Sequence, residues 1–233
     1  MTDSIYLALD FSNKKTLDQF LESNQFQGIP VKVGMELYYR EGPKIIESLK
    51  ANGHRIFLDL KLHDIPTTVM HAMNVIASLE VDMVNIHALG GSEMIKRAKE
   101  GLVEGNPNYH TKLIGVTMLT SMDNKQMNEE LLIPGDLTKN TVYLARFAQA
   151  NGADGVVCSV HEASQVKKAC GERFVTVTPG IRLVDTAVND QKRVATPSYA
   201  RQNGADYLVI GRSVTQAANP QKAYHQAVME WEE

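Results

Sequence analysis

Short apolar runs rich in β-branched residues alternate along the chain with longer segments in which apolar residues recur at helical spacing. Runs such as Ile5 to Leu9 and Ile56 to Leu58 have the length and composition of buried strands. We predict strands near 4–10, 30–34, 55–60, 82–87, 112–118, 154–158, 173–178 and 206–211. We predict helices near 13–24, 36–52, 66–79, 91–104, 138–150, 161–170, 196–203 and 219–231.

Eight strand–helix units without a change in composition predict one α/β domain over residues 1–233, a single (β/α)8 TIM barrel. An open doubly wound sheet is the alternative. A repeated four-residue motif, an echo within the sequence, supports repeated structural units. Asn151-Gly152-Ala153-Asp154 and Asn203-Gly204-Ala205-Asp206 each precede a predicted strand. We expect both glycines to take the left-handed conformation that ends a helix, which is a structural role.

Composition narrows the class of protein. The 233 residues are 43% hydrophobic and carry a net charge of -3, which suits a soluble domain and argues against nucleic-acid binding. Because no apolar stretch approaches about 18 residues, we expect neither a membrane span nor a signal peptide. Cys158 and Cys170 lack metal or redox spacing, and we expect reduced, buried thiols in a cytoplasmic protein.

Charged residues gather where the first three predicted strands end. They are Asp10, Lys32, Asp59, Lys61 and Asp64. Carboxylates and ammonium groups that converge in a cleft must neutralise one another, so such a cluster usually marks chemistry. In an extended strand, the side chains of Asp59 and Lys61 would point the same way.

Taken singly, these residues also have structural explanations. Asp10 can end its strand, Lys32 can pair with a neighbour, and Asp64 can help to cap a helix that begins at Pro66. We expect His63 to lie off the face of Asp59 and to act in packing or at an interface. His87 ends the fourth strand but lacks a second ligand at metal spacing, which favours a structural hydrogen bond over a metal site.

Two long connections follow strands and should therefore lie at the mouth of the barrel. One runs from Ser121 to about Leu137, and the other, our lid candidate, runs from Pro179 to about Thr196. Barrel enzymes often bind phosphate with the loops after strands 7 and 8. Here those loops contain Pro179-Gly180-Ile181-Arg182 and Ile210-Gly211-Arg212-Ser213. We predict a phosphate site there, in which Gly211 and a short helix admit the anion and both arginines bind it.

The segment Asp59-Leu60-Lys61-Leu62-His63-Asp64-Ile65-Pro66 resembles the signature of the orotidine 5'-phosphate decarboxylase family. Shorter motifs extend the resemblance along the chain: Leu9-Asp10, Lys32-Val33-Gly34, His87-Ala88 with Gly90-Gly91, Leu119-Thr120-Ser121, Thr178 to Arg182, and Ile210-Gly211-Arg212. The resemblance implies decarboxylation of orotidine 5'-phosphate to UMP without a cofactor or metal.

The resemblance also implies roles for individual residues. Lys61 would donate the proton, Asp59 would face the substrate carboxylate, and Lys32 would link Asp59 to the ribose. Asp64, Ile65 and Thr68 would reach into the neighbouring subunit's site, so the functional unit would be a homodimer with shared sites. The remaining implied substrate contacts are Asp10 to ribose, Thr120 to the pyrimidine, and Pro179, Arg182, Gln191, Gly211 and Arg212 around the phosphate.

Other phosphate-binding barrels remain alternatives. A ribulose-phosphate epimerase would need a metal set of His and Asp at strand ends, for which the chain offers only scattered candidates. A 3-keto-gulonate-phosphate decarboxylase shares the Asp-x-Lys-x-x-Asp pattern and works through a metal-stabilised enediolate. A non-catalytic phosphosugar sensor would bind nucleotide without needing Lys61 and Asp59 to be charged.

Overall fold

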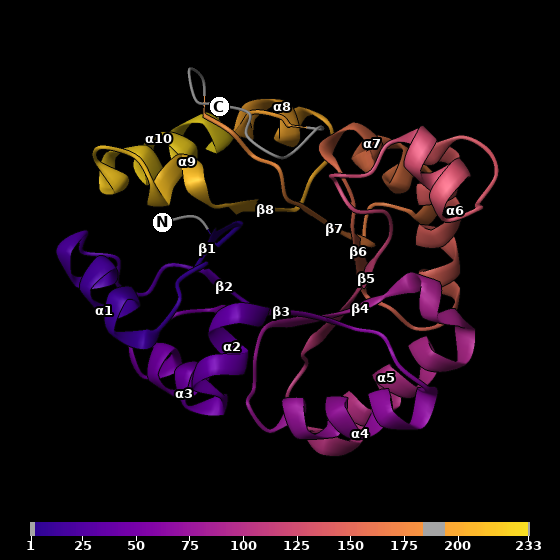
Figure 1. Ribbon diagram of the computed structural model, residues 1–233, viewed down its shortest axis with the longest axis horizontal. Coiled ribbons are helices and arrows are strands. Elements are labelled where there is room, and N and C mark those ends of the chain that lie inside the picture. Colours follow the sequence, from indigo (N-terminus) through magenta and orange to yellow (C-terminus); the bar gives the residue numbers. More distant parts are fainter. Residues whose placement is uncertain (1–2, 184–193, 233) are drawn as a thin grey trace.

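Eight parallel strands pair in sequence order, and the last closes on the first (Figure 1). We describe residues 3–183 and 194–232 in a computed structural model. The strands are β1 (Ile5–Ala8), β2 (Val31–Gly34), β3 (Ile56–Leu62), β4 (Met83–His87), β5 (Lys112–Val116), β6 (Gly155–Val157), β7 (Val175–Thr178) and β8 (Tyr207–Ile210). The closed barrel confirms the (β/α)8 prediction and excludes the open sheet.

Helices surround the ring of strands on its outside (Figure 1). They are α1 (Lys14–Ser23), α2 (Met35–Glu41), α3 (Pro43–Ala51), α4 (Pro66–Ala77), α5 (Gly91–Gly105), α6 (Leu137–Ala150), α7 (Val160–Cys170), α8 (Pro197–Gln202), α9 (Arg212–Thr215) and α10 (Pro220–Glu232). Two single-turn elements complete the set, the 3-10 turn η1 (Ala88–Gly90) and the π-helical turn η2 (Gln126–Glu130). None of the helices in the described residues is long and apolar enough to cross a membrane.

The single helix predicted over 36–52 is wrong, because the chain forms α2 and α3 instead. Gly42 separates them with φ +66°, and Pro43 opens α3. Proline has no amide hydrogen and suits the first turn of a helix, so the second helix must begin there. The expected left-handed glycines are confirmed, with φ +99° at Gly152 and +78° at Gly204.

Alternation along the strands divides the apolar core into two parts. Ile5, Leu7 and Leu9 face the helices, whereas Tyr6 and Ala8 face the barrel interior. The same alternation carries the next interior position, residue 10, to the carboxyl-terminal mouth. Packed apolar side chains fill the lower interior, where the rings of Tyr6 and Phe57 meet edge to face with centroids 6.2 Å apart. In the part of the chain that the structure describes, the barrel interior is therefore packed with side chains below its mouth.

The two cysteines are free thiols, as predicted, but only Cys158 is buried. Cys170 is the last residue of α7 and is half-buried, so the expectation of two buried thiols is wrong for that residue.

Candidate active site

A cavity of about 310 Å³ opens at the carboxyl ends of the strands. The predicted site residues that line it are Asp10, Lys32, Asp59, Lys61, Thr120, Pro179, Arg182, Gly211 and Arg212. Its wall also includes apolar side chains that the sequence analysis did not single out, among them Phe57, Met118 and Val157. The cavity therefore combines an apolar floor with a charged rim, as is common for small-molecule sites.

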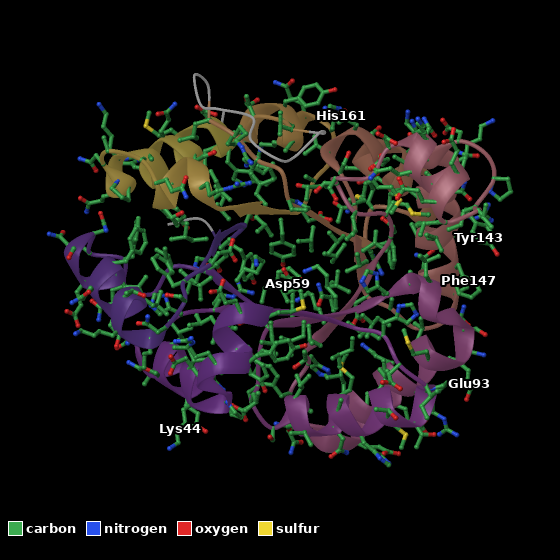
Figure 2. The ribbon with its side chains drawn as sticks, viewed as in Figure 1. Lys44, Asp59, Glu93, Tyr143, Phe147 and His161 are labelled. Carbon is green, nitrogen blue, oxygen red and sulfur yellow. The ribbon has the colours of Figure 1, made fainter. Side chains whose placement is uncertain are left out.

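Two lysines and two carboxylates form an alternating chain in this cavity. The Lys61 Nζ atom is 2.6 Å from Asp59 Oδ1, and the Lys32 Nζ atom is 3.1 Å from Asp59 Oδ2. Lys32 also reaches Asp10 Oδ1 at 3.5 Å. Asp59 thus receives one ammonium group on each oxygen, and Figure 2 shows it near the middle of the ring of strands.

Burial and pairing act in opposite directions on this network. Burial opposes the charge of Lys32, but Asp59 and Asp10 outweigh it and hold the pKa of Lys32 above its usual value. Burial likewise opposes ionisation of Asp59, but Lys32 and then Lys61 hold its pKa below the usual value. Both groups therefore stay charged at neutral pH, and a fixed field faces the cavity.

The backbone at Lys61 is not an ordinary strand. Its φ is +52°, and the β3–β4 pairing shifts register between Leu58 and Leu62. Lys61 still reaches Asp59, but through this irregularity and not through the simple alternation that we expected. Bulges of this kind commonly re-aim side chains beside active sites.

Two arginines line the mouth in the segments after β7 and β8. Arg182 is buried, and its Nη1 atom donates to the Ile181 carbonyl at 2.9 Å. Burial, and then the nearby Arg212, lower the pKa of Arg182. Two guanidinium groups that line one cavity and repel each other favour an anion between them.

The two ends of the lid candidate are hydrogen-bonded to each other at Arg182. Ile181 and Ala195 form a parallel bridge, and the Arg182 amide donates to the Ala195 carbonyl at 2.9 Å. Most of the lid candidate, including Gln191, lies outside the described residues.

Three predicted site residues do not line the cavity of this chain. Asp64, Ile65 and Thr68 are all exposed around the start of α4. Pro66 is the first residue of the helix, as expected, but the residue at the cap position is Ile65 and no side chain caps the helix. Asp64 accepts the Ile65 amide hydrogen at 2.6 Å instead, so the capping explanation for Asp64 is wrong. Four of the five clustered charges therefore meet within one chain, and Asp64 lies apart from them.

The two histidines beside the site contact each other. The rings of His63 and His87 have centroids 5.5 Å apart, and neither ring lines the cavity. His63 is thus off the face of Asp59, as expected, although strict alternation would have placed it on that face. In the described residues, no group of three or more His, Cys, Asp or Glu side chains is arranged to hold a metal ion.

Besides the apolar lining, sequence reasoning missed a polar residue that supports this site, Asn85. It is fully buried on β4, between the interior-facing Met83 and the mouth. Its side chain donates to Asp59 Oδ1 and accepts the Lys61 amide hydrogen, each at 2.7 Å. A polar residue at an interior position of an otherwise apolar strand was the available signal.

The fold and this cavity define a (β/α)8-barrel protein whose charged site occupies the mouth, where barrel enzymes perform catalysis. The chain belongs to the Orotidine 5'-phosphate decarboxylase / HUMPS family, whose model matches residues 3–227. It is 51% identical over 234 residues to the orotidine 5'-phosphate decarboxylase of Bacillus cytotoxicus, covering 100% of this chain and 98% of that one.

Solved structures agree with the family assignment. The orotidine 5'-phosphate decarboxylase from Lactobacillus acidophilus matches with a TM-score of 0.88 and 38% identity over 100% of both chains. An uncharacterized conserved protein from Geobacillus kaustophilus matches with a TM-score of 0.85 and 45% identity, over 97% of this chain and 99% of that one.

Proposed function

We propose that this protein decarboxylates orotidine 5'-phosphate to UMP and carbon dioxide, the last step of de novo UMP synthesis, without a cofactor. The observation that carries the proposal is the Lys32–Asp59–Lys61 network at the mouth of a barrel of this family. Relatives that are 51% identical and are named orotidine 5'-phosphate decarboxylases support it.

The charge of the cavity suits this substrate. Four cationic side chains (Lys32, Lys61, Arg182 and Arg212) and two carboxylates (Asp10 and Asp59) line it, an excess of two positive charges. Orotidine 5'-phosphate carries a phosphate and a carboxylate, so the field of the cavity attracts it.

Lys61 is the proposed catalytic acid. Loss of carbon dioxide leaves an electron pair in the plane of the pyrimidine ring, where the π system cannot delocalise it. An ammonium group fixed beside the reacting carbon stabilises that charge and then protonates it. The Lys61 ammonium, 2.6 Å from Asp59, is held in place for both tasks.

The other carboxylates and Lys32 have distinct proposed roles. Asp59 faces the substrate carboxylate, Lys32 links Asp59 to the ribose, and Asp10 binds the ribose hydroxyls. Side-chain exposures of 12% for Asp59 and 64% for Asp10 support a deep reacting centre under a more open sugar site.

The energy of repulsion between Asp59 and the substrate carboxylate can be compared with the barrier reduction that catalysis needs. Repulsion between two carboxylates 4 Å apart is about 4 kcal/mol at an effective dielectric near 20. Strongly accelerating enzymes lower the barrier by roughly 20 kcal/mol. Relief of repulsion is therefore a minor part of catalysis, and stabilisation of the transition state by fixed charge is the larger one.

The phosphate is proposed to bind between the segments after β7 and β8. Arg182, Arg212, Gly211 and Pro179 line the cavity there. Thr120, which also lines the cavity, is the proposed contact to the pyrimidine. Gln191, in the lid candidate, would complete the phosphate contacts. Binding energy from the phosphate is then available to close the lid and exclude water.

The proposed functional unit is a homodimer of single-domain subunits with shared sites. Asp64, Ile65 and Thr68 are its proposed contributions to the partner's site, and the exposure of Ile65, at 67%, supports a contact beyond this chain. A cytoplasmic location belongs to the same proposal, supported by the free thiols of Cys158 and Cys170.

The test is an activity assay on the purified protein. Orotidine 5'-phosphate is added in the presence of a chelator, and ultraviolet absorbance follows its conversion to UMP. Unchanged turnover in chelator is the expected result. Turnover that depends on added metal would favour the enediolate chemistry of a related barrel, and binding without turnover would favour a sensor.

A further inference from the structure

Asn85 is a fully buried amide whose hydrogen bonds converge on the two residues at the reacting centre. Burying an amide is unfavourable unless its polar atoms are bonded. Here one end donates to Asp59 and the other accepts from the main chain of Lys61, each at 2.7 Å. The orientation of the amide is fixed by its partners, since a carboxylate only accepts and an N–H group only donates.

The bond to Lys61 holds an unfavourable backbone conformation. Four described residues other than glycine have positive φ (Gln25, Lys61, Glu80 and Leu132), and Lys61 is the one that lies within a strand. Such a conformation is unfavourable for a residue with a side chain and persists only where the surroundings impose it. Asn85 supplies an acceptor for the Lys61 amide at the point where the β3–β4 register shifts.

The bond to Asp59 selects the position of its carboxylate. Asp59 Oδ1 receives both Asn85 Nδ2 and Lys61 Nζ, which leaves Oδ2 toward Lys32. Without the amide, the carboxylate could rotate and move the Lys61 ammonium with it. Asn85 is uncharged and therefore directs this pair without altering the charge of the cavity.

We propose that Asn85 is a positioning residue, which sets the lysine and the carboxylate of the reacting centre through one side chain. This inference rests on the proposed decarboxylation. An alanine has neither the donor nor the acceptor. An aspartate keeps the shape and one acceptor but loses the donor and adds a negative charge next to Asp59. Both substitutions should therefore move the Lys61 ammonium.

The experiment compares Asn85→Ala and Asn85→Asp with Ile86→Ala in the full-length protein. Ile86 is the next residue of β4, is fully buried, and packs toward the helices and away from the cavity. It controls for loss of stability, because a large-to-small substitution in the core destabilises the fold. Steady-state kinetics, UMP affinity and thermal unfolding are measured for each variant.

We expect both Asn85 variants to lose about 100-fold in kcat, because a displacement of about 1 Å at a reacting group has an effect of that size. UMP affinity should stay near the wild-type value, since the phosphate and ribose contacts remain. Ile86→Ala should lose stability but keep its turnover. A structural role alone would lower stability in all three variants without separating kcat from UMP binding.

A second measurement does not depend on activity. The amide resonance of Lys61 is followed by NMR, and it should move far more in Asn85→Asp than in Ile86→Ala. Near wild-type kcat in a folded Asn85 variant, or an unmoved Lys61 resonance, would overturn the inference. Absence of decarboxylation by the wild-type protein would instead refute the proposed function, and the resonance would still test the geometry. Asn85→Asp keeps the volume of the side chain and serves if Asn85→Ala does not fold.

Discussion

Lys61 combines three unusual properties in one residue: a left-handed backbone, an ion pair at 2.6 Å and a position in the charged lining of a cavity. Its side chain is 27% exposed, so it is open to a ligand, and its ammonium is held by a buried carboxylate. A flexible lysine on a loop would have to be ordered when the substrate binds. Here the ordering is complete before binding, which is the condition for electrostatic catalysis.

Replacing Lys61 separates binding from chemistry. We expect Lys61→Ala to bind UMP measurably and to lose decarboxylation by several orders of magnitude, because the proton donor is gone. Turnover of orotidine 5'-phosphate and UMP affinity by calorimetry give the two readouts. Lys125→Ala is a suitable control, since that side chain is 79% exposed in a surface pair. Near wild-type turnover in Lys61→Ala would refute the assigned role.

A buried histidine on the other side of the fold predicts a pH effect on stability. The Nδ1 atom of His54 is 2.8 Å from the Ile29 carbonyl. Burial lowers the pKa of His54, against the opposing effect of this hydrogen bond. The unfolded chain therefore takes up a proton at a higher pH than the folded protein does.

Stability from neutral His54 is complete above about pH 6.5 and is lost as the pH falls through the lower pKa of the folded state. We expect the Tm of the wild type to fall more steeply between about pH 7 and pH 5 than that of His54→Asn, whose amide keeps a donor for Ile29. Calorimetry over this range checks it. Parallel curves for the two proteins would contradict the prediction.

At the scale of elements, one device recurs at the amino-terminal ends of the strands. The amide of Asp206 donates to the carbonyl of Thr176, and its carboxylate accepts from the amide of that same residue. Asp154 does the same with Leu113, and Asp82 with Ile56. Each aspartate thus joins two neighbouring strands through one residue.

A cation accompanies each aspartate of this device: Arg55 with Asp82, Lys99 with Asp154, and Lys167 with Asp206. The Asn-Gly-Ala-Asp echo in the sequence contains two of the three aspartates. Its glycines end a helix and its aspartates fix the following strand, so the echo marks the lower rim of the barrel.

The Asp154–Lys99 and Asp206–Lys167 pairs should contribute differently to stability, because their lysines differ in burial. The Lys167 side chain is 6% exposed, and that of Lys99 is 33% exposed. Asp206→Asn leaves a buried ammonium without its carboxylate, and we expect a loss of about 3–5 kcal/mol. Asp154→Asn breaks a more exposed pair, and we expect about 1 kcal/mol. Urea unfolding measures both, and equal losses would contradict the role of burial.

At the scale of the molecule, the exposed position of Asp64 suggests a test of shared sites. We expect Asp64→Asn and Lys61→Ala subunits to be inactive alone and partly active when mixed. In a mixed dimer, both substitutions can fall in one site and leave the other intact. Random exchange at equal amounts should restore about a quarter of wild-type activity.

The control for this mixing experiment is a pair of Lys61→Ala subunits carrying different tags. That pair should exchange subunits and remain inactive. Demonstrated exchange of the two different variants without recovery would contradict shared sites.

The sequence predicted the barrel well, because eight strand–helix units leave few arrangements that bury every apolar face. It also predicted most of the cavity, since charged residues at strand ends must meet at one rim. It did not predict the left-handed backbone conformation of Lys61 or the hydrogen bonds of Asn85 to Asp59 and Lys61. Both depend on a register shift between β3 and β4. The break at Gly42-Pro43 was readable as a turn signal, but the apolar periodicity on both sides concealed it.

Closure of β8 on β1 has a consequence for how activity arises during synthesis. Asp10 leaves the ribosome well before Arg212, yet both line the same cavity. No partial chain that lacks β8 can present the complete set of charges to a ligand. The first turnover in cell-free translation would therefore mark the moment when β8 closes the barrel. Two fragments of the chain, expressed separately, would likewise report their reassembly by regaining turnover.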